Sequence, residues 1–535
     1  MNNILALVRN VKIKCTFDSS EVLDCAAIKK ALKILRSALH ASFSESDAFV
    51  YKKSVDARDR GDILLVYTVA VSVPEEMLSK KVRGVDFLVM QNYDEMFLHS
   101  KKTESSPVVV GFGPSGMFCA LVLAKAGLCP VVIERGADVD ERAKKVDSYW
   151  KDGILDTETN VQFGEGGAGT FSDGKLLTRI SDKLSGYVLS ELVRHGAPKE
   201  IAYLAKPHIG TDNLRNVVKS IRKEIISLGG KVLFNTKLES ICADASGRVT
   251  SVVLGNGEEL KCDSLFLCIG HSARDTVKNL MSNNVSVLPK PFSVGVRIEH
   301  LQSDINDALY GDFAGAECLG AAQYTLSRKY GTRAVYSFCM CPGGTVVASA
   351  SDKNQIVTNG MSYYARDGKN ANSAIAVSVD TEDFGNTVEG AIRFQEDIEK
   401  RAYAVAGGDG TAPIQLLSDF FEGKAESAPD KIIPTYTGRV AVRNADDVFP
   451  KFITDGLRRG ISDFDRDIKG FSCGSAVLTF PETRTSSPVR IPRNDKFLAD
   501  GFLNLYPCGE GAGYAGGITS AAVDGIKAAI CYLNN

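Results

Sequence analysis

The 535-residue sequence lacks the features that identify membrane proteins, disulfide-stabilised secreted proteins and metal-binding proteins. It contains no apolar run near the roughly 20 residues with which a helix crosses a bilayer. Its thirteen cysteines are odd in number and scattered, without disulfide-framework spacing and without any C-x-x-C pair. No set of residues has the spacing of metal ligands, so we expect no metal site.

Charge of either sign is not in excess. The chain has 63 Lys and Arg against 65 Asp and Glu, which is a formal net charge of −2. This balance provides no overall attraction to nucleic acids or to an acidic membrane. The beginning of the sequence also lacks the long apolar stretch of a secretory signal. We therefore expect a reduced, cytoplasmic protein that does not associate with membranes.

A glycine-rich turn between two short apolar segments is the most informative motif that is present. The turn that follows residues 108–110 consists of Gly111, Phe112, Gly113, Pro114, Ser115 and Gly116. Gly111 permits a tight turn, Gly113 lets backbone N–H groups approach a pyrophosphate, and Gly116 allows close packing of helix on strand. The helix that begins near Ser115 would direct its positive end at the phosphates.

The second apolar segment ends in Glu134 and Arg135. Glu134 follows Gly116 by 18 positions, near the spacing of about 20 at which an acid accepts hydrogen bonds from ribose hydroxyls. An ordinary strand-to-helix turn is the alternative interpretation. The strand, the glycines, the helix and the acid together favour a dinucleotide-binding site that includes Arg135.

Two further glycine-rich loops are candidates for the same ligand. The loop at 163–176 contains Gly167, Ala168, Gly169 and Thr170, and the loop at 509–518 contains Gly509, Glu510, Gly517 and Ile518. A carboxylate in such a loop can bind sugar or ribityl hydroxyls, and a helix that begins near Ile518 can stabilise negative charge. A flexible surface loop and a tight structural turn are the respective alternatives.

Length and periodicity predict several domains. A chain of this length is too long for one hydrophobic core. Residues 1–100 show a β-α-β-β-α-β order, typical of a ferredoxin-like α+β domain. Alternating strands and helices in residues 104–275, continued by 490–535, predict a discontinuous Rossmann-like domain with a doubly wound parallel sheet. Residues 276–489 predict an inserted, mixed α+β substrate or cap domain.

These motifs resemble those of the two-dinucleotide-binding-domain flavoproteins. Within that group the chain resembles the uncharacterised bacterial FAD-dependent dehydrogenases that are often labelled NAD-utilising. The resemblance rests on Gly111–Glu134, 163–176, 338–344, 359–366, 482–490 and 509–518. It implies that FAD is the tightly held cofactor, that the backbone of Leu238 contacts adenine, and that the Gly270 turn passes near the cofactor. In relatives of this fold Asp often stands where Glu510 stands here.

The function predicted from these features is that of an FAD-dependent oxidoreductase acting on an unidentified small molecule. The sequence has one full glycine fingerprint, so NAD(P)H as electron donor would bind transiently, in the inserted domain or at the flavin face. No catalytic acid or base is assigned. We interpret Cys339 and Cys341 as buried structural thiols rather than as a redox pair. Polar residues at 297–300, 359–366 and 482–490 are candidates for substrate contacts or for a salt-bridged domain joint.

Two other functions stay open at this point. A flavin monooxygenase would share the fold but let oxygen react at the cofactor. A flavin-bound module for RNA or protein binding would use the N-terminal domain, where basic and aromatic residues lie close in sequence: Phe49, Tyr51, Lys52, Lys53, Arg58 and Arg60.

Overall fold

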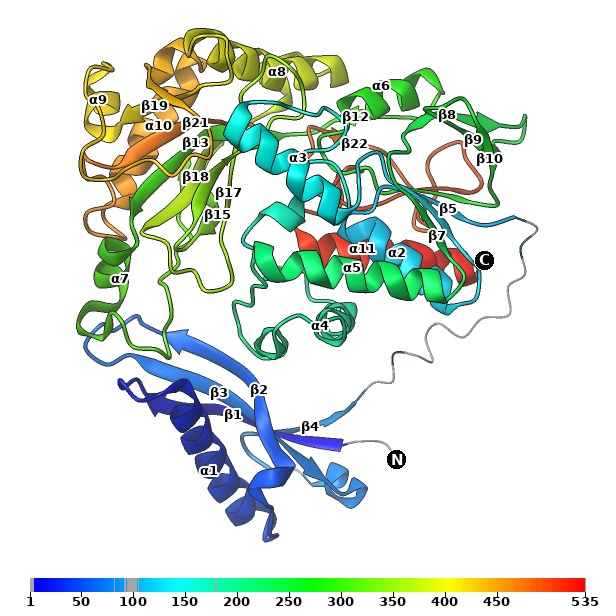
Figure 1. Ribbon diagram of the computed structural model, residues 1–535. Coiled ribbons are helices and arrows are strands. Elements are labelled where there is room, and N and C mark those ends of the chain that lie inside the picture. Colours follow the sequence, from blue (N-terminus) through cyan, green and yellow to red (C-terminus); the bar gives the residue numbers. More distant parts are fainter. Residues whose placement is uncertain are drawn as a thin grey trace.

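The computed structural model describes residues 4–80, 82–90, 93, 103, 105–178 and 180–534. The chain folds into a mixed α/β structure that contains a parallel sheet, a larger mixed sheet and a separate N-terminal lobe (Figure 1). From its composition we also predict a polar linker at 101–106, and three of its six residues, 101, 102 and 104, lie outside the described residues. Among the helices of the described part, none has the length and apolar character needed to span a membrane.

The parallel sheet joins segments from distant parts of the sequence. Its strand order is β23-β11-β5-β6-β7. Its strands are β5 (Val108–Val110), β6 (Val131–Ile133), β7 (Lys231–Leu233), β11 (Leu265–Leu267) and β23 (Leu505–Pro507). Because β23 pairs with β11 in parallel register, the C-terminal segment completes the sheet that β5 begins.

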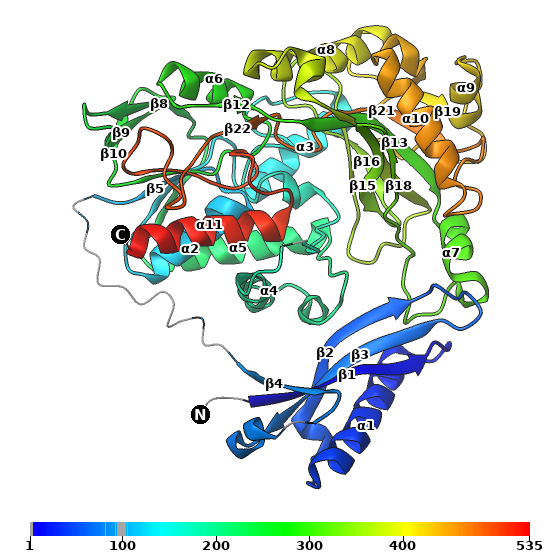
Figure 2. The same ribbon diagram turned by 180° about the vertical axis from the view of Figure 1, so that it is seen from behind.

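Helices cover one face of this sheet, on which Val109 and Phe266 point into a shared core. These helices are α2 (Pro114–Lys125), α4 (Leu184–Arg194), α5 (Thr211–Ser227) and α11 (Ile518–Asn534). Figure 2 shows α11 beside α2 and α5. The alternate strand residues, such as Val110 and Leu267, point to the opposite face, as the two-residue period of a strand requires.

The opposite face carries mainly a small antiparallel sheet. Its strands are β8 (Leu238–Ala243), β9 (Val249–Leu254) and β10 (Glu259–Lys261). A doubly wound sheet carries helices on both faces, whereas here a β-meander and helix α6 (Arg274–Ser282) share the second face. The chain between β7 and β11 crosses the second face as a β-meander because two tight turns, rather than a helical periodicity, follow Leu238.

The larger sheet has seven strands in the order β14-β15-β18-β13-β21-β19-β20. They are β13 (Phe292–Leu301), β14 (Ser327–Tyr330), β15 (Arg333–Cys341), β18 (Asn370–Val379), β19 (Ala412–Leu416), β20 (Val440–Val442) and β21 (Val477–Glu482). Helices α8 (Val388–Val405) and α10 (Lys451–Phe464) pack on this sheet. Nearly every residue of β13 and β18 is buried, which places these strands at its centre.

Shorter elements lie between these strands and helices along the chain. They are α3 (Val139–Asp152), α6 (Arg274–Ser282), β12 (Leu288–Pro289), α7 (Gln302–Tyr310), β16 (Thr345–Ala348), β17 (Thr358–Met361), α9 (Leu417–Glu422) and β22 (Val489–Arg490). β12 and β22 pair antiparallel, so the chain leaves and re-enters the parallel-sheet part side by side.

The N-terminal lobe is a four-stranded antiparallel sheet with one α-helix. Its elements are β1 (Ile4–Lys14), α1 (Ser20–Leu39), β2 (Ala48–Asp56), β3 (Leu64–Val73) and β4 (Val85–Val89). The strand order is β2-β3-β1-β4. β3 lies between β1 and β2, as in a split βαβ unit. The second helix expected near 75–81 is a five-residue 3-10 segment, Glu75–Ser79.

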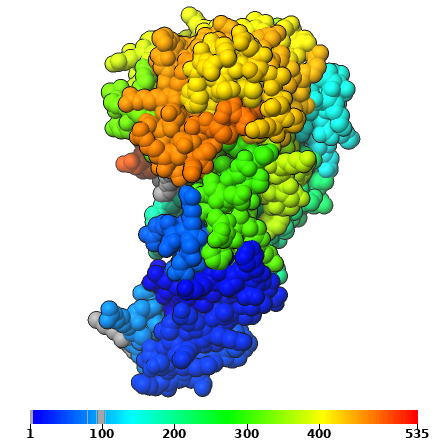
Figure 3. Space-filling view, turned by 90° about the vertical axis from the view of Figure 1, so that its left-hand side faces the viewer, coloured from blue at the N-terminus to red at the C-terminus, as the bar shows by residue number. Residues whose placement is uncertain are grey.

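Figure 3 shows the lobe against the rest of the molecule. Two contacts among the described residues illustrate this packing. The Cys15 Sγ lies 3.4 Å from the Cys318 Sγ, and both thiols are buried. In the other contact, the edge strand β2 pairs with residues 203–205. The Lys53 N–H donates to the Tyr203 carbonyl, and the Lys53 carbonyl accepts from the Ala205 N–H, each at 2.8 Å. The lobe therefore holds the segment that leads into residue 206.

Candidate functional site

A cavity of about 430 Å³ opens at the carboxyl ends of the parallel strands. Val110, Ile133 and Cys268, at or just beyond the ends of β5, β6 and β11, line it. Residues 337–341 of β15 form another part of the wall. Ligands of parallel α/β sheets bind in the crevice outside the carboxyl ends of the strands. The cavity has this position.

The first glycine turn needs glycine for reasons of space. Gly111 has a φ of +94°, and a Cβ there would lie 2.4 Å from the Cys268 carbonyl oxygen. A Cβ on Gly116 would lie 2.0 Å from the Gly111 carbonyl oxygen. α2 begins directly after Gly113, with Pro114 in its first turn. The turn thus brings the N-terminus of a helix to the cavity, the arrangement that binds phosphate groups.

The two other glycine-rich loops meet this turn. A Cβ on Gly167 would lie 3.0 Å from the Gly113 Cα, so the two backbones touch. A Cβ on Gly169 would lie 3.2 Å from the Ile518 side chain, at the start of α11. A Cβ on Gly509 would lie 2.8 Å from the Ser115 Cβ. Three segments that are far apart in the sequence therefore form one wall of the cavity.

Glu134 holds the first two loops together. Its carboxylate is buried and accepts three backbone hydrogen bonds: Phe112 N–H at 2.8 Å, Gly164 N–H at 2.9 Å and Gly136 N–H at 3.0 Å. A carboxylate offers about four acceptor positions. Three of these acceptor positions are therefore used by backbone N–H groups of the loops. The carboxylate also lines the cavity, where about one acceptor position is left for a ribose hydroxyl.

Arg135 lines the cavity beside Glu134. Its guanidinium donates to both Asp275 carboxylate oxygens at 2.9 and 3.0 Å and to the Glu158 carboxylate at 2.8 Å. It also lies 4.0 Å from the centre of the Phe163 ring. These contacts fix the orientation of the side chain, and they neutralise its charge at the cavity wall.

Glu510 differs from Glu134 in having no partner. Among the described residues, no hydrogen bond or ion pair reaches its carboxylate, although it lines the cavity. Burial raises the pKa of Glu510 to about 7, and the ammonium of Lys290 lowers it in part. A desolvated carboxyl group without partners is costly. It is the group in this wall that a ligand hydroxyl would satisfy.

The cavity brings together most of the residues that the sequence singled out. Those that line it are Gly111, Gly113, Pro114, Ser115, Glu134, Arg135, Gly167, Ala168, Gly169, Leu238, Gly270, Glu510, Gly517 and Ile518. Gly116, Thr170 and Gly509 do not line it. Gly116 and Gly509 serve the packing of α2 instead, and the Thr170 hydroxyl donates to the Glu165 carbonyl at 3.3 Å.

Several cavity residues were not predicted as binding residues. Gln162 donates to the Asn359 side chain at 3.0 Å and accepts from the Ser272 hydroxyl at 3.2 Å. Asp173 forms an ion pair with Arg366, with an Oδ1–Nε distance of 2.9 Å. Residue 206 also lines the wall. Asp173 belongs to the predicted loop at 163–176, whereas Gln162 and residue 206 lie outside the predicted loops and reach the cavity through contacts between distant segments.

Cys339 and Cys341 both line the cavity, but they do not share one face of a regular strand. The pairing of β15 with β18 shifts between Phe338 and Cys341, and Cys339 has a φ of +43°. The Cys341 thiol donates to the Cys339 carbonyl at 3.2 Å. Burial raises the pKa of Cys339 to about 12 and also raises that of Cys341. Both groups are therefore thiols, not thiolates, at neutral pH.

Buried ion pairs in and next to the cavity wall join its parts. The Arg297 guanidinium forms two hydrogen bonds with Glu482, at 2.7 and 3.0 Å, and both side chains are buried. Glu399 accepts from Arg274 at 2.8 Å and from Arg484 at 3.2 Å. Arg274 belongs to α6 and Glu399 to α8, so this second cluster is the salt-bridged joint that was one interpretation of residues 482–490.

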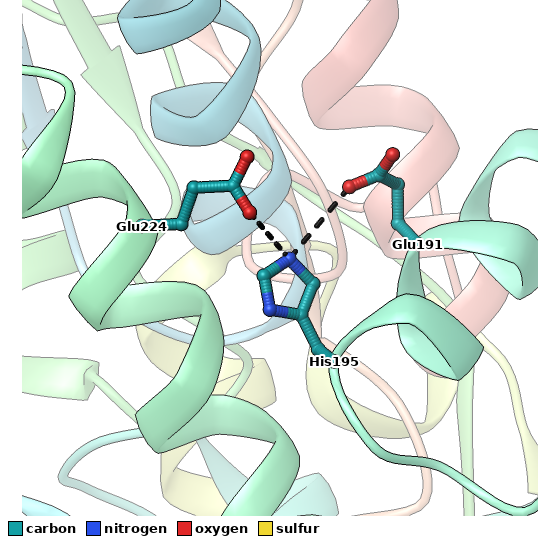
Figure 4. Close-up of side chains that lie close together, drawn as sticks. All are labelled: Glu191, His195 and Glu224. Carbon is teal, nitrogen blue, oxygen red and sulfur yellow. Dashed lines mark ion pairs between the residues drawn. The ribbon is translucent and has the colours of Figure 1, made fainter.

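A cluster of Glu191, His195 and Glu224 could offer ligand atoms to a cation, since these atoms lie within 4.8 Å of one another (Figure 4). Cations of the protein already occupy it. Arg194 pairs with Glu191 at 2.7 Å and with Glu224 at 2.5 Å, and Lys125 pairs with Glu191 at 3.0 Å. The cluster is an ion-pair network that joins α2, α4 and α5 outside the cavity.

The residues of the cavity fit FAD. The glycine turn and the start of α2 would offer N–H groups to a pyrophosphate, and the carboxylates of Glu134 and Glu510 line the cavity, where ligand hydroxyls would bind. Gly113 lines the cavity and has no Cβ. A side chain at this position would fill the space in which a phosphate group would lie. The cavity volume lies in the range of about 300–1,000 Å³ that is usual for cofactor sites.

Solved structures of flavoproteins are similar to this chain at low identity. Halogenase PltM is 11% identical, with a TM-score of 0.37, over 81% of this chain and 68% of its own. The glycerol-3-phosphate dehydrogenase from Bacillus halodurans, complexed with FAD, is 11% identical, with a TM-score of 0.33, over 82% and 67%. CtdE in complex with FAD is 12% identical, with a TM-score of 0.32, over 81% and 85%.

Sequence comparison is more informative. Residues 291–485 match the family model described as "FAD-dependent protein, C-terminal domain-like". An uncharacterized protein of Clostridium beijerinckii (strain ATCC 51743 / NCIMB 8052) is 47% identical over 486 residues, which cover 90% of this chain and 91% of that protein. The chain therefore belongs to the same family as this Clostridium beijerinckii protein.

Proposed function

We propose that the protein is an FAD-dependent oxidoreductase that acts on a small molecule, with FAD held in the cavity between the glycine loops. The convergence of three glycine-rich segments at one wall carries this proposal, because Gly113, Gly167 and Ile518 come from distant parts of the sequence. Three such loops in contact would be conformationally costly for a structural turn alone.

Each wall of the cavity has a distinct part in this function. Bound FAD supplies the electron-transfer chemistry. The turn at Gly113 and the N-terminus of α2 bind the pyrophosphate. Glu134 orients the ribose, and the Leu238 backbone contacts the adenine. Glu510 binds a ribityl hydroxyl, and the positive end of α11 at Ile518 faces the same cavity.

The proposed electron donor is NAD(P)H, bound transiently. The sequence has one complete glycine fingerprint, and in this proposal that motif binds FAD. The nicotinamide would therefore bind against residues of the inserted segment. Residues 323–325 and 337–341 form this part of the cavity wall. We propose accordingly that the chain is one of the NAD-utilising dehydrogenases. A reaction in the cytoplasm is the corresponding proposal for its location.

Anaerobic flavin reduction tests this function. Purified protein is expected to show the visible absorbance of flavin, and NADH or NADPH is expected to bleach it without oxygen. The Gly113→Val variant is expected to purify without flavin, because the valine side chain would occupy the pyrophosphate position. An unfolding temperature equal to that of the wild type would show that this variant is folded. Wild-type protein that binds no FAD, even after reconstitution, would contradict the proposal.

Two observations separate the alternatives. In a monooxygenase, NAD(P)H consumption would be slow until oxygen is added. In a dehydrogenase, NAD(P)H would reduce the flavin at the same rate with and without oxygen. For RNA binding, the N-terminal lobe has fewer free cations than its sequence indicates. Lys53 forms a buried ion pair with Asp24 at 2.7 Å, and Arg58 pairs with Asp56 at 2.6 Å.

A further inference from the structure

Two lysines line the cavity without a carboxylate partner. The Lys175 Nζ donates to the Met340 carbonyl, and no hydrogen bond or ion pair reaches the Lys206 ammonium from any described residue. Lys206 is exposed, so its side chain stands at the mouth of the cavity. No part of the FAD site described above uses either lysine.

Backbone pairing fixes the two lysines on neighbouring segments. The Leu176 N–H donates to the Pro207 carbonyl at 3.0 Å, and the Ile209 N–H donates to the Gly174 carbonyl at 3.1 Å. Lys175 thereby forms an isolated antiparallel bridge with His208. Residues 203–205, directly before Lys206, are held by the edge strand of the N-terminal lobe. Lys175 and Lys206, together called the cationic wall, are therefore held in place by the fold without a ligand.

The other cations around the cavity are neutralised by acids. Arg366 is paired with Asp173, and Arg297 with Glu482. Arg135 and Lys237 share Asp275, and Arg484 has Asp352 and Glu399. The excess charge of this part of the cavity is therefore positive, and it comes from Lys175 and Lys206. Partial desolvation at the cavity mouth lowers the pKa of Lys206, and the charges of Lys175 and Arg366 lower it further.

We propose that Lys175 and Lys206 bind the anionic group of the substrate, so that the substrate is an organic anion. This inference rests on the proposed function, because the substrate would occupy the cavity beside FAD. Ammonium groups bind carboxylates and phosphates through charge-assisted hydrogen bonds. Apolar surface flanks the cationic wall, since Leu177 is exposed and Phe338 is half-buried. A carboxylate or phosphate on an apolar body matches both features.

Titration of the FAD-bound protein with simple anions tests the proposal. The probes are benzoate for the carboxylate and phenyl phosphate for the phosphate, with benzyl alcohol as the neutral comparison. Binding is read from the flavin difference spectrum and from the thermal unfolding temperature. At least one anion is expected to bind and benzyl alcohol is not. The stronger of the two anions identifies the class of anionic group.

Variants at position 206 show whether the cationic wall is the site that binds the anion. Lys206→Gln is expected to weaken anion binding by about tenfold or more, and Lys206→Arg to retain most of it. Lys261→Gln, an exposed lysine of β10 outside the cavity, serves as the matched control. Anion binding that is absent, or equal in Lys206→Gln and wild type, would overturn the proposal.

A separate measurement distinguishes the two proposals. If Lys206→Gln or Lys206→Glu loses affinity for FAD itself, the lysine serves the cofactor, and the substrate assignment is wrong. If the wild-type protein fails to bind FAD at all, the proposed function fails first. FAD binding that is unchanged in both variants, together with lost anion binding, supports the inference.

Discussion

The Glu134 carboxylate accepts a hydrogen bond from the Phe112 N–H at 2.8 Å, inside the turn that the sequence assigns to a pyrophosphate. An acid expected to bind the ligand directly also shapes the loop that binds it. The same carboxylate reaches the Gly164 N–H in the second glycine-rich loop. Glu134 therefore links two of the three segments that form the cavity wall.

Replacement of Glu134 should affect both folding and cofactor binding. In Glu134→Gln one carboxylate oxygen becomes an NH₂ group that faces N–H donors. We expect the free energy of unfolding to fall by about 1–3 kcal/mol and FAD to bind more weakly. Denaturant unfolding and flavin titration measure the two effects. Glu239→Gln, exposed on β8, is the control and should change neither quantity.

Two glycines of the cavity region should respond differently to alanine. A Cβ on Gly116 would lie 2.0 Å from the Gly111 carbonyl oxygen, whereas no atom lies within 4 Å of a Cβ on Gly516. Gly116→Ala should lower the free energy of unfolding by roughly 1–3 kcal/mol. Gly516→Ala should leave it unchanged within about 0.5 kcal/mol. Equal unfolding midpoints for the two variants would contradict the described packing of α2.

The stability of the FAD-free protein should depend on Glu510. The pKa of Glu510 is raised to about 7 in the folded protein, above its value of about 4.3 in an unfolded chain. A group with a raised pKa contributes stability that is complete below the unfolded pKa and is lost as the pH rises through the folded pKa. Stability should therefore fall between about pH 4.5 and pH 7.5 by roughly 1–3 kcal/mol.

Glu510→Gln provides the comparison, because the amide has a similar shape and does not titrate. Denaturant unfolding of the FAD-free variant across the same pH range should show a flatter dependence than that of the wild type. A wild-type profile that rises toward pH 7.5, or identical slopes for the two proteins, would argue against a desolvated Glu510 carboxyl group.

Cys339 should react slowly with alkylating reagents despite its exposure to the cavity. Its pKa is raised to about 12 by burial, so little thiolate is present at neutral pH. At pH 8 iodoacetamide should modify the exposed Cys25 faster than Cys339, as followed by peptide mass mapping. In the Cys339→Ser variant, NAD(P)H should still reduce the flavin. Loss of flavin reduction in this variant would indicate a redox thiol.

The local patterns of the sequence were sufficient for the glycine-rich turn, for the strands on both sides of it and for the two other glycine-rich loops of the cavity wall. Glycine spacing is informative because a Cβ at Gly111 or Gly116 would overlap the backbone, whatever the rest of the chain does. The same patterns did not predict which surface the strands of residues 238–261 would cover. A period of two residues shows a strand but not which surface that strand covers.

The sequence alone determined that this chain carries a dinucleotide-type turn and two further glycine-rich loops, since each depends on residues adjacent in the chain. Only the tertiary structure decided that the three loops share one cavity, that Arg297 is neutralised by Glu482, and that Lys175 and Lys206 are not neutralised. Charge pairing depends on distances between residues far apart in sequence, and chain folding sets those distances.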